Sequence, residues 1–228
     1  MTSRRFAVLT AVNALLCFLL ILAALLVGAS YDVRRDPYFA SAYALLGAFW
    51  LAAALRWFPM LGISLRDDVM ERRNRAAFWA LNGALIGLAA CYAGANIGNG
   101  PGPEAVLFCA VLGSGTFVLL WFLADLLALH WADAITVDRD YGSGLRFGAF
   151  LLATGFAIGS ALTGDWMSYE ATVRDFLVRS WPLLPVLAVA VSLQKRFRGS
   201  KRAGAPWAGA AVIVILASLC ILVERSLR

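Results

Sequence analysis

The chain has 228 residues, of which 61% are hydrophobic and 15% charged, with a mean hydropathy of +0.76 and a net charge of +6. Soluble globular domains average about 45–50% apolar and about 25% charged residues, so this composition excludes an ordinary soluble domain. The charges interrupt apolar runs of roughly 18 to 25 residues, the length of a helix that crosses a bilayer. Because a backbone in lipid must satisfy its own hydrogen bonds, each run predicts a transmembrane α-helix.

Seven such spans are expected along the chain. The first follows Arg4 and Arg5 and is too long for the apolar region of a signal peptide, so we interpret it as a retained helix. The sixth has Pro182 and Pro185 in its first turns, where proline is tolerated. The spans cover approximately residues 6–28, 39–58, 76–97, 104–130, 144–163, 180–195 and 206–223.

The placement of Lys and Arg predicts the orientation. With a cytoplasmic N-terminus, fourteen of the twenty cations lie on the inner side and six on the outer side, and residues 97–104 carry none. The positive-inside rule therefore favours a cytoplasmic N-terminus and a periplasmic C-terminus. The cationic face is expected to attract anionic lipid headgroups, and no nucleic-acid partner is needed to explain it. The inner cations are Arg4, Arg5, Arg56, Arg66, Arg72, Arg73, Arg75, Arg139, Arg146, Lys195, Arg196, Arg198, Lys201 and Arg202, and the outer ones are Arg34, Arg35, Arg174, Arg179, Arg225 and Arg228.

The use of cysteine and lysine bears on chemistry and compartment. All four cysteines, Cys17, Cys91, Cys109 and Cys220, fall inside apolar spans, where they act as small hydrophobic residues without metal-ligand spacing. Only two lysines stand against eighteen arginines, which suggests a GC-rich bacterial genome. We expect a bacterial inner-membrane protein without a cofactor or a metal.

The core is predicted to be an internal repeat of two helical hairpins. The segments ERRNRAAFWALNGALIG and DRDYGSGLRFGAFLLATG align when Asn74 is set against Asp140. Each begins with a charged loop and a helix N-cap residue, whose side-chain oxygen accepts from free backbone N–H groups. The expected organisation is a helix and outer loop at 1–38, a duplicated four-helix core at 39–166 and two helices at 167–228.

Small residues in the third and fifth spans recur on one helix face. Gly83 and Gly87 belong to this stripe in the third span, and Gly144, Gly148 and Gly155 belong to it in the fifth. In lipid such stripes let helices approach closely. We interpret them as packing seams, either between these two spans or with the spans of a second copy.

At these residues the chain resembles the YjfL-like inner-membrane proteins, the family of the domain of unknown function 350. The resemblance covers about residues 40–166 and is carried by Asn74, Ala76, Ala77, Gly83 and Gly87, then by Gly144, Gly148 and Gly155. The second repeat departs from the family pattern, because Asp140 replaces the usual Asn. The resemblance implies a core of two two-helix repeats and an association with membrane maintenance or envelope stress.

Four polar residues are candidate intramembrane sites. Asp125 is costly within a span, so it either pairs with Arg146 near the cytoplasmic interface or lines an ion or proton path. His130, the only histidine, is either a helix-end residue or a metal or proton site. Asn82 is expected to form a hydrogen bond with a neighbouring helix.

Two outer segments each allow two interpretations. The loop at 94–104 is rich in glycine and asparagine, which favours a tight turn over an anion site. The segment at 164–181 carries four aromatic residues and suits either an interfacial aromatic belt or a surface for partner docking.

Three classes of function follow. A non-enzymatic scaffold or adaptor, with membrane-protein partners or as a homo-oligomer, fits the dense packing best. A channel or transporter with Asp125 on its path is the alternative, although the spans offer few polar residues for a path. An enzyme fits least, because no HExxH, Ser-His, Cys-His or paired acidic motif is present.

Overall fold

The structure, a computed structural model, describes residues 3–199 and 205–227, and over these residues it contains helices and no strand. This confirms the all-α bundle. Lys201, Arg202 and Arg228, which the orientation argument uses, lie outside the described residues. The elements are α1 (Ser3–Gly28), α2 (Tyr31–Arg35), α3 (Pro37–Trp57), η1 (Phe58–Leu61), η2 (Leu65–Glu71), α4 (Arg75–Ala95), α5 (Pro103–Leu127), α6 (Trp131–Thr136), α7 (Tyr141–Leu162), α8 (Tyr169–Arg179), α9 (Leu183–Phe197) and α10 (Ala205–Ser226).

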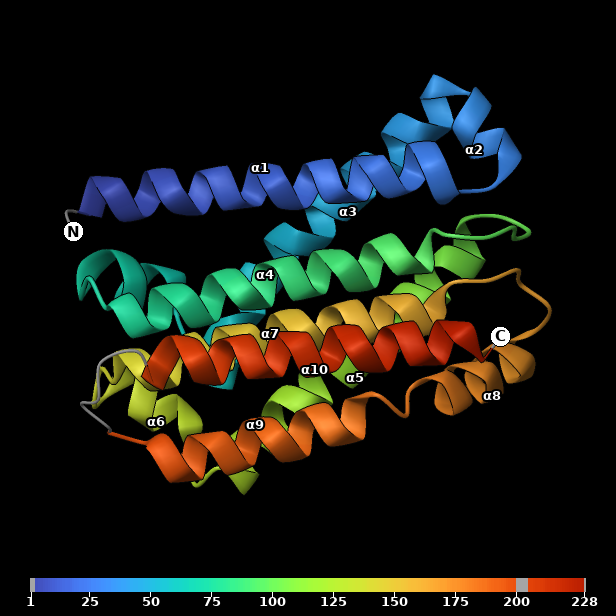
Figure 1. Cartoon of the computed structure of the whole chain (residues 1–228). Helices are drawn as coiled ribbons and strands as arrows, with labels where there is room; N and C mark the ends of the chain where they lie inside the picture. Colours follow the sequence, from blue (N-terminus) through green and yellow to red (C-terminus); the bar gives the residue numbers. More distant parts are fainter. Residues whose placement is uncertain (1–2, 200–204, 228) are drawn as a thin grey trace.

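Six helices among the described residues are long and apolar enough to cross a membrane: α1, α3, α4, α5, α7 and α10. The pair α8 and α9, bent by 46°, raises the number to seven if it forms one span. The two ends of the chain lie at opposite ends of the bundle (Figure 1), as an odd number of crossings requires. The protein is therefore a multi-pass membrane protein, as its composition predicts.

The sixth predicted span differs most from the helix observed. It was expected to start at residue 180, but α9 begins at Leu183, directly after Pro182. At 1.5 Å per residue its 15 residues extend only about 22 Å, short of the roughly 30 Å of hydrocarbon. The preceding α8 carries Ser168 as its N-cap, which accepts from the Ala171 N–H at 3.1 Å. The outer segment is thus helical and continues into α9 through a bend.

The second copy of the core lies 66 residues after the first. Pro37 and Pro103 stand at the start of α3 and α5, and Asn74 and Asp140 cap α4 and α7. In each copy a short helix directly precedes the second long helix, η2 in the first copy and α6 in the second. The predicted duplication is therefore present in the helices themselves and extends to the connection between them.

The backbone around the two caps repeats in the same register. Arg73 and Arg139 both adopt the left-handed conformation, with φ of 53° and 54°. The Asn74 N–H donates to the carbonyl six residues before it, and the Asp140 N–H does the same, at 2.9 Å in both. Both cap side chains then accept from two backbone N–H groups of the helix that follows.

The glycine stripes meet each other within one chain. Helices α4 and α7 lie side by side in the middle of the bundle (Figure 1) and form its most extensive contact. A Cβ atom built on Gly83 would overlap the Gly148 carbonyl, and one on Gly155 would overlap the Gly87 carbonyl. We call this contact the glycine seam. Because only hydrogen atoms stand between the two backbones, the seam confirms the packing interpretation and needs no second copy.

A methyl group at the seam is expected to destabilise the fold. Gly155→Ala must push two backbones apart, and overpacking of this kind costs about 1–3 kcal/mol. Gly115 on α5 is the matched control, because a Cβ atom there meets nothing within 4 Å. Unfolding by sodium dodecyl sulfate in mixed micelles should show a lower midpoint for Gly155→Ala and a midpoint for Gly115→Ala at or above that of the wild type. Equal midpoints for the two variants would contradict the seam.

Candidate functional site

The most deeply buried charge in the described chain is Arg146, with 1% of its surface exposed. It lies on the second turn of α7, at the end of the bundle that carries the N-terminus. Its Nε and Nη2 donate to the Gln194 side-chain oxygen at 3.1 and 2.8 Å, and Nη2 also donates to the Phe197 carbonyl at 3.3 Å. Its acidic partner is Asp140, at 3.8 Å. Arg146 therefore joins α9 to the core at two points, the Gln194 side chain and the carbonyl of its last residue, Phe197.

Ser143 completes this group, which we call the inner polar cluster: Asp140, Ser143, Arg146 and Gln194. The Gln194 amide donates to the Ser143 hydroxyl at 2.7 Å, and that hydroxyl donates to Asp140 at 2.5 Å. Gln194 and Ser143 are fully buried. A buried guanidinium is tolerated only with such partners, and the cluster supplies them as a hydrogen-bonded network.

The two helix caps differ in the contacts they make beyond their own helices. The Asn74 amide group donates to the Ile135 carbonyl in α6 at 2.7 Å and so joins the two copies. The Asp140 side chain has no N–H to donate; it accepts from the Gly199 N–H at 3.2 Å and faces Arg146 instead. The second copy therefore has Asp where the first has Asn, and its cap contacts Arg146 and Gly199 where the first cap contacts the other copy.

The structure does not bring Asp125 and Arg146 together, which corrects the pairing considered from the sequence. Asp125 lies in the last turns of α5 and accepts from the Ala132 N–H at 2.6 Å, at the start of α6. Its other neighbour is His130, whose Nδ1 is 4.0 Å away and whose side chain is 71% exposed. Asp125 has a local partner because α5 ends two residues after it and the chain turns back towards it.

Among the described residues no group of three or more His, Cys, Asp or Glu side chains is placed to hold a metal ion. His130 takes the left-handed conformation with φ of 59° and precedes α6. That position is a helix junction at the end of the bundle. The metal or proton role considered for His130 stays untested.

Asn82 lies in the seam helix α4 and borders a hollow. Its amide donates to the Phe78 carbonyl at 2.7 Å, and its own carbonyl accepts from Asn13 of α1 at 3.2 Å. The contact with α1 uses the Asn82 backbone carbonyl, and the Asn82 side chain bonds within its own helix, so the side-chain bond expected with a neighbouring helix is not formed. The Asn82 side-chain oxygen is buried and has no hydrogen-bond partner.

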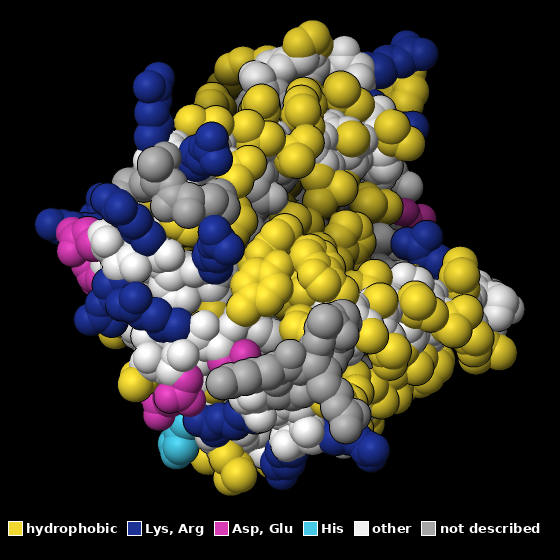
Figure 2. All heavy atoms as spheres, turned by 60° about the vertical axis from the view of Figure 1, so that its left-hand side comes forward, with side chains coloured by type: hydrophobic (Ala, Val, Ile, Leu, Met, Phe, Trp, Pro, Cys, Tyr) yellow, Lys and Arg dark blue, Asp and Glu magenta, His cyan; other side chains and the backbone are white. Residues whose placement is uncertain are grey.

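A large hollow lies beside Asn82, and we call it the side groove. It encloses about 740 Å³ between α1, α4, α7 and α10, with Phe6, Trp79, Ala149 and Val214 among its lining residues. Figure 2 turns this end of the molecule forward and shows hydrophobic side chains through its middle, with Lys and Arg clustered beside them. The size lies within the range of about 300–1,000 Å³ typical of small-molecule sites.

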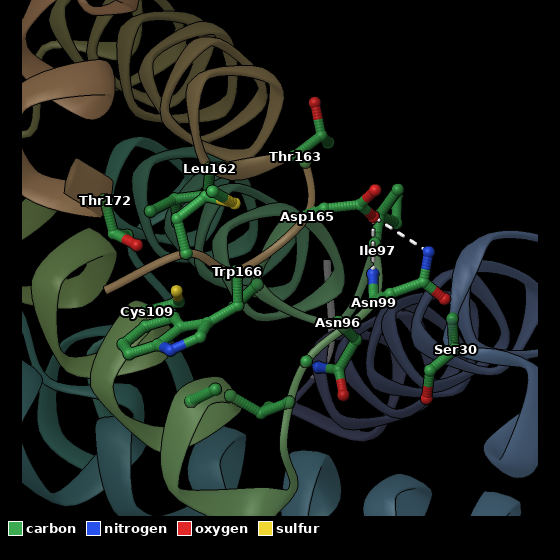
Figure 3. Close-up of a pocket in the computed structure, with 18 of the residues that line it drawn as sticks. Ser30, Asn96, Ile97, Asn99, Cys109, Leu162, Thr163, Asp165, Trp166 and Thr172 are labelled. Atoms are coloured by element: carbon green, nitrogen blue, oxygen red, sulfur yellow. Dashed lines mark hydrogen bonds between the residues drawn. The ribbon is translucent and has the colours of Figure 1, made fainter. Parts of the chain in front are cut away.

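The second hollow, the outer pocket, lies at the opposite end, where the two outer loops meet. Asn96, Cys109, Trp166 and Thr172 surround it (Figure 3), and its volume is about 90 Å³. Asp165 accepts from the backbone and side-chain N–H groups of Asn99 at 2.8 and 2.9 Å. A space of this size holds a few water molecules and no larger ligand.

The loops around the outer pocket turn at glycines. Gly98 and Gly164, again 66 residues apart, have backbone φ angles of 128° and 145°, which residues with a side chain rarely adopt. The Gly164 N–H donates to the Ile97 carbonyl at 3.0 Å, so the loops hold each other. The loop at 94–104 is therefore the tight turn that its composition favours.

Sequence reasoning missed Gln194, Ser143 and Asn13. Each is a single polar residue in an apolar run, and only the fold shows that the first two meet Arg146 and the third meets Asn82. The usable signal was weak: a glutamine ahead of the basic stretch that ends α9.

The fold and these sites define a polytopic helical membrane protein whose duplicated core is closed at the glycine seam and hollowed at its side. The chain belongs to the family described as Domain of Unknown Function (DUF350), whose model matches residues 36–162. This confirms the resemblance found in the repeat motifs. No curated protein and no solved structure matches the chain.

Removal of Gln194 is expected to leave Arg146 buried without its principal acceptor. Hydrogen bonds to charged groups contribute about 1.5–3 kcal/mol, so Gln194→Leu should lower the free energy of unfolding in mixed micelles by an amount in that range. The double variant Arg146→Met with Gln194→Leu should recover much of the loss, because no uncompensated charge then remains. Ser192→Ala, an exposed change on the same helix, is the control. Additive losses in the double variant would contradict the coupling.

Proposed function

We propose that the protein is a non-enzymatic scaffold of the bacterial inner membrane that acts in membrane maintenance or envelope stress. The glycine seam carries this proposal, because it locks α4 and α7 into one unit by backbone contact. Around that unit, α1, α3 and α10 each keep most of their surface uncovered by the rest of the chain. A rigid centre with free apolar flanks suits a protein that organises lipids and neighbouring membrane proteins.

The alternative, an ion or small-solute channel with Asp125 on its path, has less support. Asp125 caps the start of α6 in the turn at one end of the bundle. The side groove and the outer pocket lie towards opposite ends, and the glycine seam runs along the helices between them. A conduit would need the seam to open or a second chain to supply a wall.

The orientation belongs to the same proposal. Most described cations lie at the end of the bundle that holds the N-terminus, where Figure 2 shows them clustered. A cytoplasmic N-terminus places this face against the anionic inner leaflet.

Cysteine labelling in intact cells tests the orientation. The four native cysteines are buried, so the background reaction with a membrane-impermeant maleimide should be low. Arg174→Cys, at a side chain 78% exposed, should react in intact cells, whereas Arg66→Cys, at one 85% exposed, should react only after permeabilisation. The reverse pattern would place the N-terminus outside.

Complementation and flux together test the scaffold against the conduit. A scaffold predicts that liposomes with purified protein show no ion or proton flux above empty liposomes. It also predicts that Asp125→Asn, expressed at the wild-type level, restores growth of a deletion strain under membrane stress as well as the wild type does. Ion-selective flux that Asp125→Asn abolishes, with loss of complementation, would replace the scaffold by the channel. Failure of the wild-type gene to restore growth would contradict the role in envelope stress.

A further inference from the structure

The side groove has the dimensions of one membrane leaflet. Along α4 it extends from Arg75 to Ile86, about 16 Å at 1.5 Å per residue. Half of a hydrocarbon core of about 30 Å is about 15 Å. The groove therefore begins at the arginine-bearing end of the bundle and ends near the middle of the membrane.

Its walls are apolar and its mouth is cationic and aromatic. Arg75 is exposed at the start of α4, and no acidic side chain of the described residues lies within ion-pair distance of it. Trp79 and Trp207 pack edge to face at 5.7 Å at the same end, and Tyr141 lies 6.4 Å from Trp207. Tryptophan, tyrosine and arginine are the residues that settle at the headgroup level of a bilayer.

We propose that the side groove binds one acyl chain of an anionic phospholipid, with the headgroup phosphate beside Arg75. This goes beyond the scaffold proposal and does not depend on it, since a channel or a scaffold could carry such a site. Deeper in the groove, Phe78, Ile86 and Leu152 offer the apolar contacts that a hydrocarbon chain requires. The charge at the mouth selects the headgroup.

The volume favours a single chain over a transmembrane helix. Over the roughly 16 Å that the groove covers, a helix about 10 Å wide occupies on the order of 1,300 Å³, which is above the 740 Å³ of the side groove. The Asn82 side-chain oxygen is buried and its amide donates to the Phe78 carbonyl, so the groove wall at this depth offers little to a polar residue of a partner helix.

Native mass spectrometry of the full chain with an equimolar mixture of dioleoylphosphatidylglycerol and dioleoylphosphatidylcholine tests the proposal. The wild type should retain one phosphatidylglycerol in preference to phosphatidylcholine. Ala149→Phe, which fills the groove, should lose that lipid, whereas Ala52→Phe on the outer face of α3 should keep it. Arg75→Gln should reduce the preference for phosphatidylglycerol about fivefold, the effect of one cation near an anionic headgroup. Arg196→Gln removes a cation at the same end, outside the groove, and should leave the preference unchanged.

Asn82→Leu keeps the groove wall apolar and should retain the lipid, because an acyl chain makes no hydrogen bond there. Retention of the lipid by Ala149→Phe, or an equal loss of preference in Arg196→Gln, would overturn the proposal. A wild-type dimer without bound lipid that Ala149→Phe dissociates would assign the groove to a helix of a second copy. Thermal stability of each variant in detergent shows that a lost lipid is not a lost fold.

Discussion

Close approach of two backbones inside the membrane is the constraint on which this fold depends. Apolar side chains gain little by leaving lipid for protein, so helices associate through packing at short range, and only residues without a side chain permit the shortest range. At Gly155 and Gly83 the opposing backbone already occupies the place of a Cβ atom. The other helices are arranged around this seam: α1 packs on α4, and α10 packs on α7. The seam also explains how both glycine stripes are used within one chain.

Duplication supplies two equivalent helix caps, and a single change between them gives the copies different roles. Asn74 both accepts and donates, so it can cap α4 and also hold the Ile135 carbonyl of the other copy. The Asp140 side chain can only accept, and it carries a negative charge. Arg146 is the cation beside it, and the Nη2 of Arg146 also donates to the Gln194 side chain and to the Phe197 carbonyl at the end of α9. The difference between Asp140 and Asn74 is thus linked to the docking of α9, which lies outside the matched residues 36–162.

The sequence predicted what depends on local pattern and missed what depends on contacts between distant residues. Span lengths, the caps Asn74 and Asp140 and the seam follow from hydropathy, capping chemistry and the period of small residues. The pairing of Asp125 with Arg146 was considered because both are charged and close to one interface. It failed because Asp125 finds a backbone N–H only seven residues away, in a turn whose path no periodicity reveals. The bond between Gln194 and Arg146 could not be predicted for the same reason, since the two residues are 48 positions apart in the sequence.

Two glycines of the seam between α4 and α7 also line the side groove. Gly83 and Gly148 belong to the seam and at the same time border the side groove. Where α4 and α7 touch they present no side chains, so the space above the contact, between α1 and α10, stays unfilled by the core. A side chain at either position would meet the opposing backbone and separate the two helices that form the floor of the groove. Close packing at the centre and the shape of the groove at the side thus depend on the same two glycines.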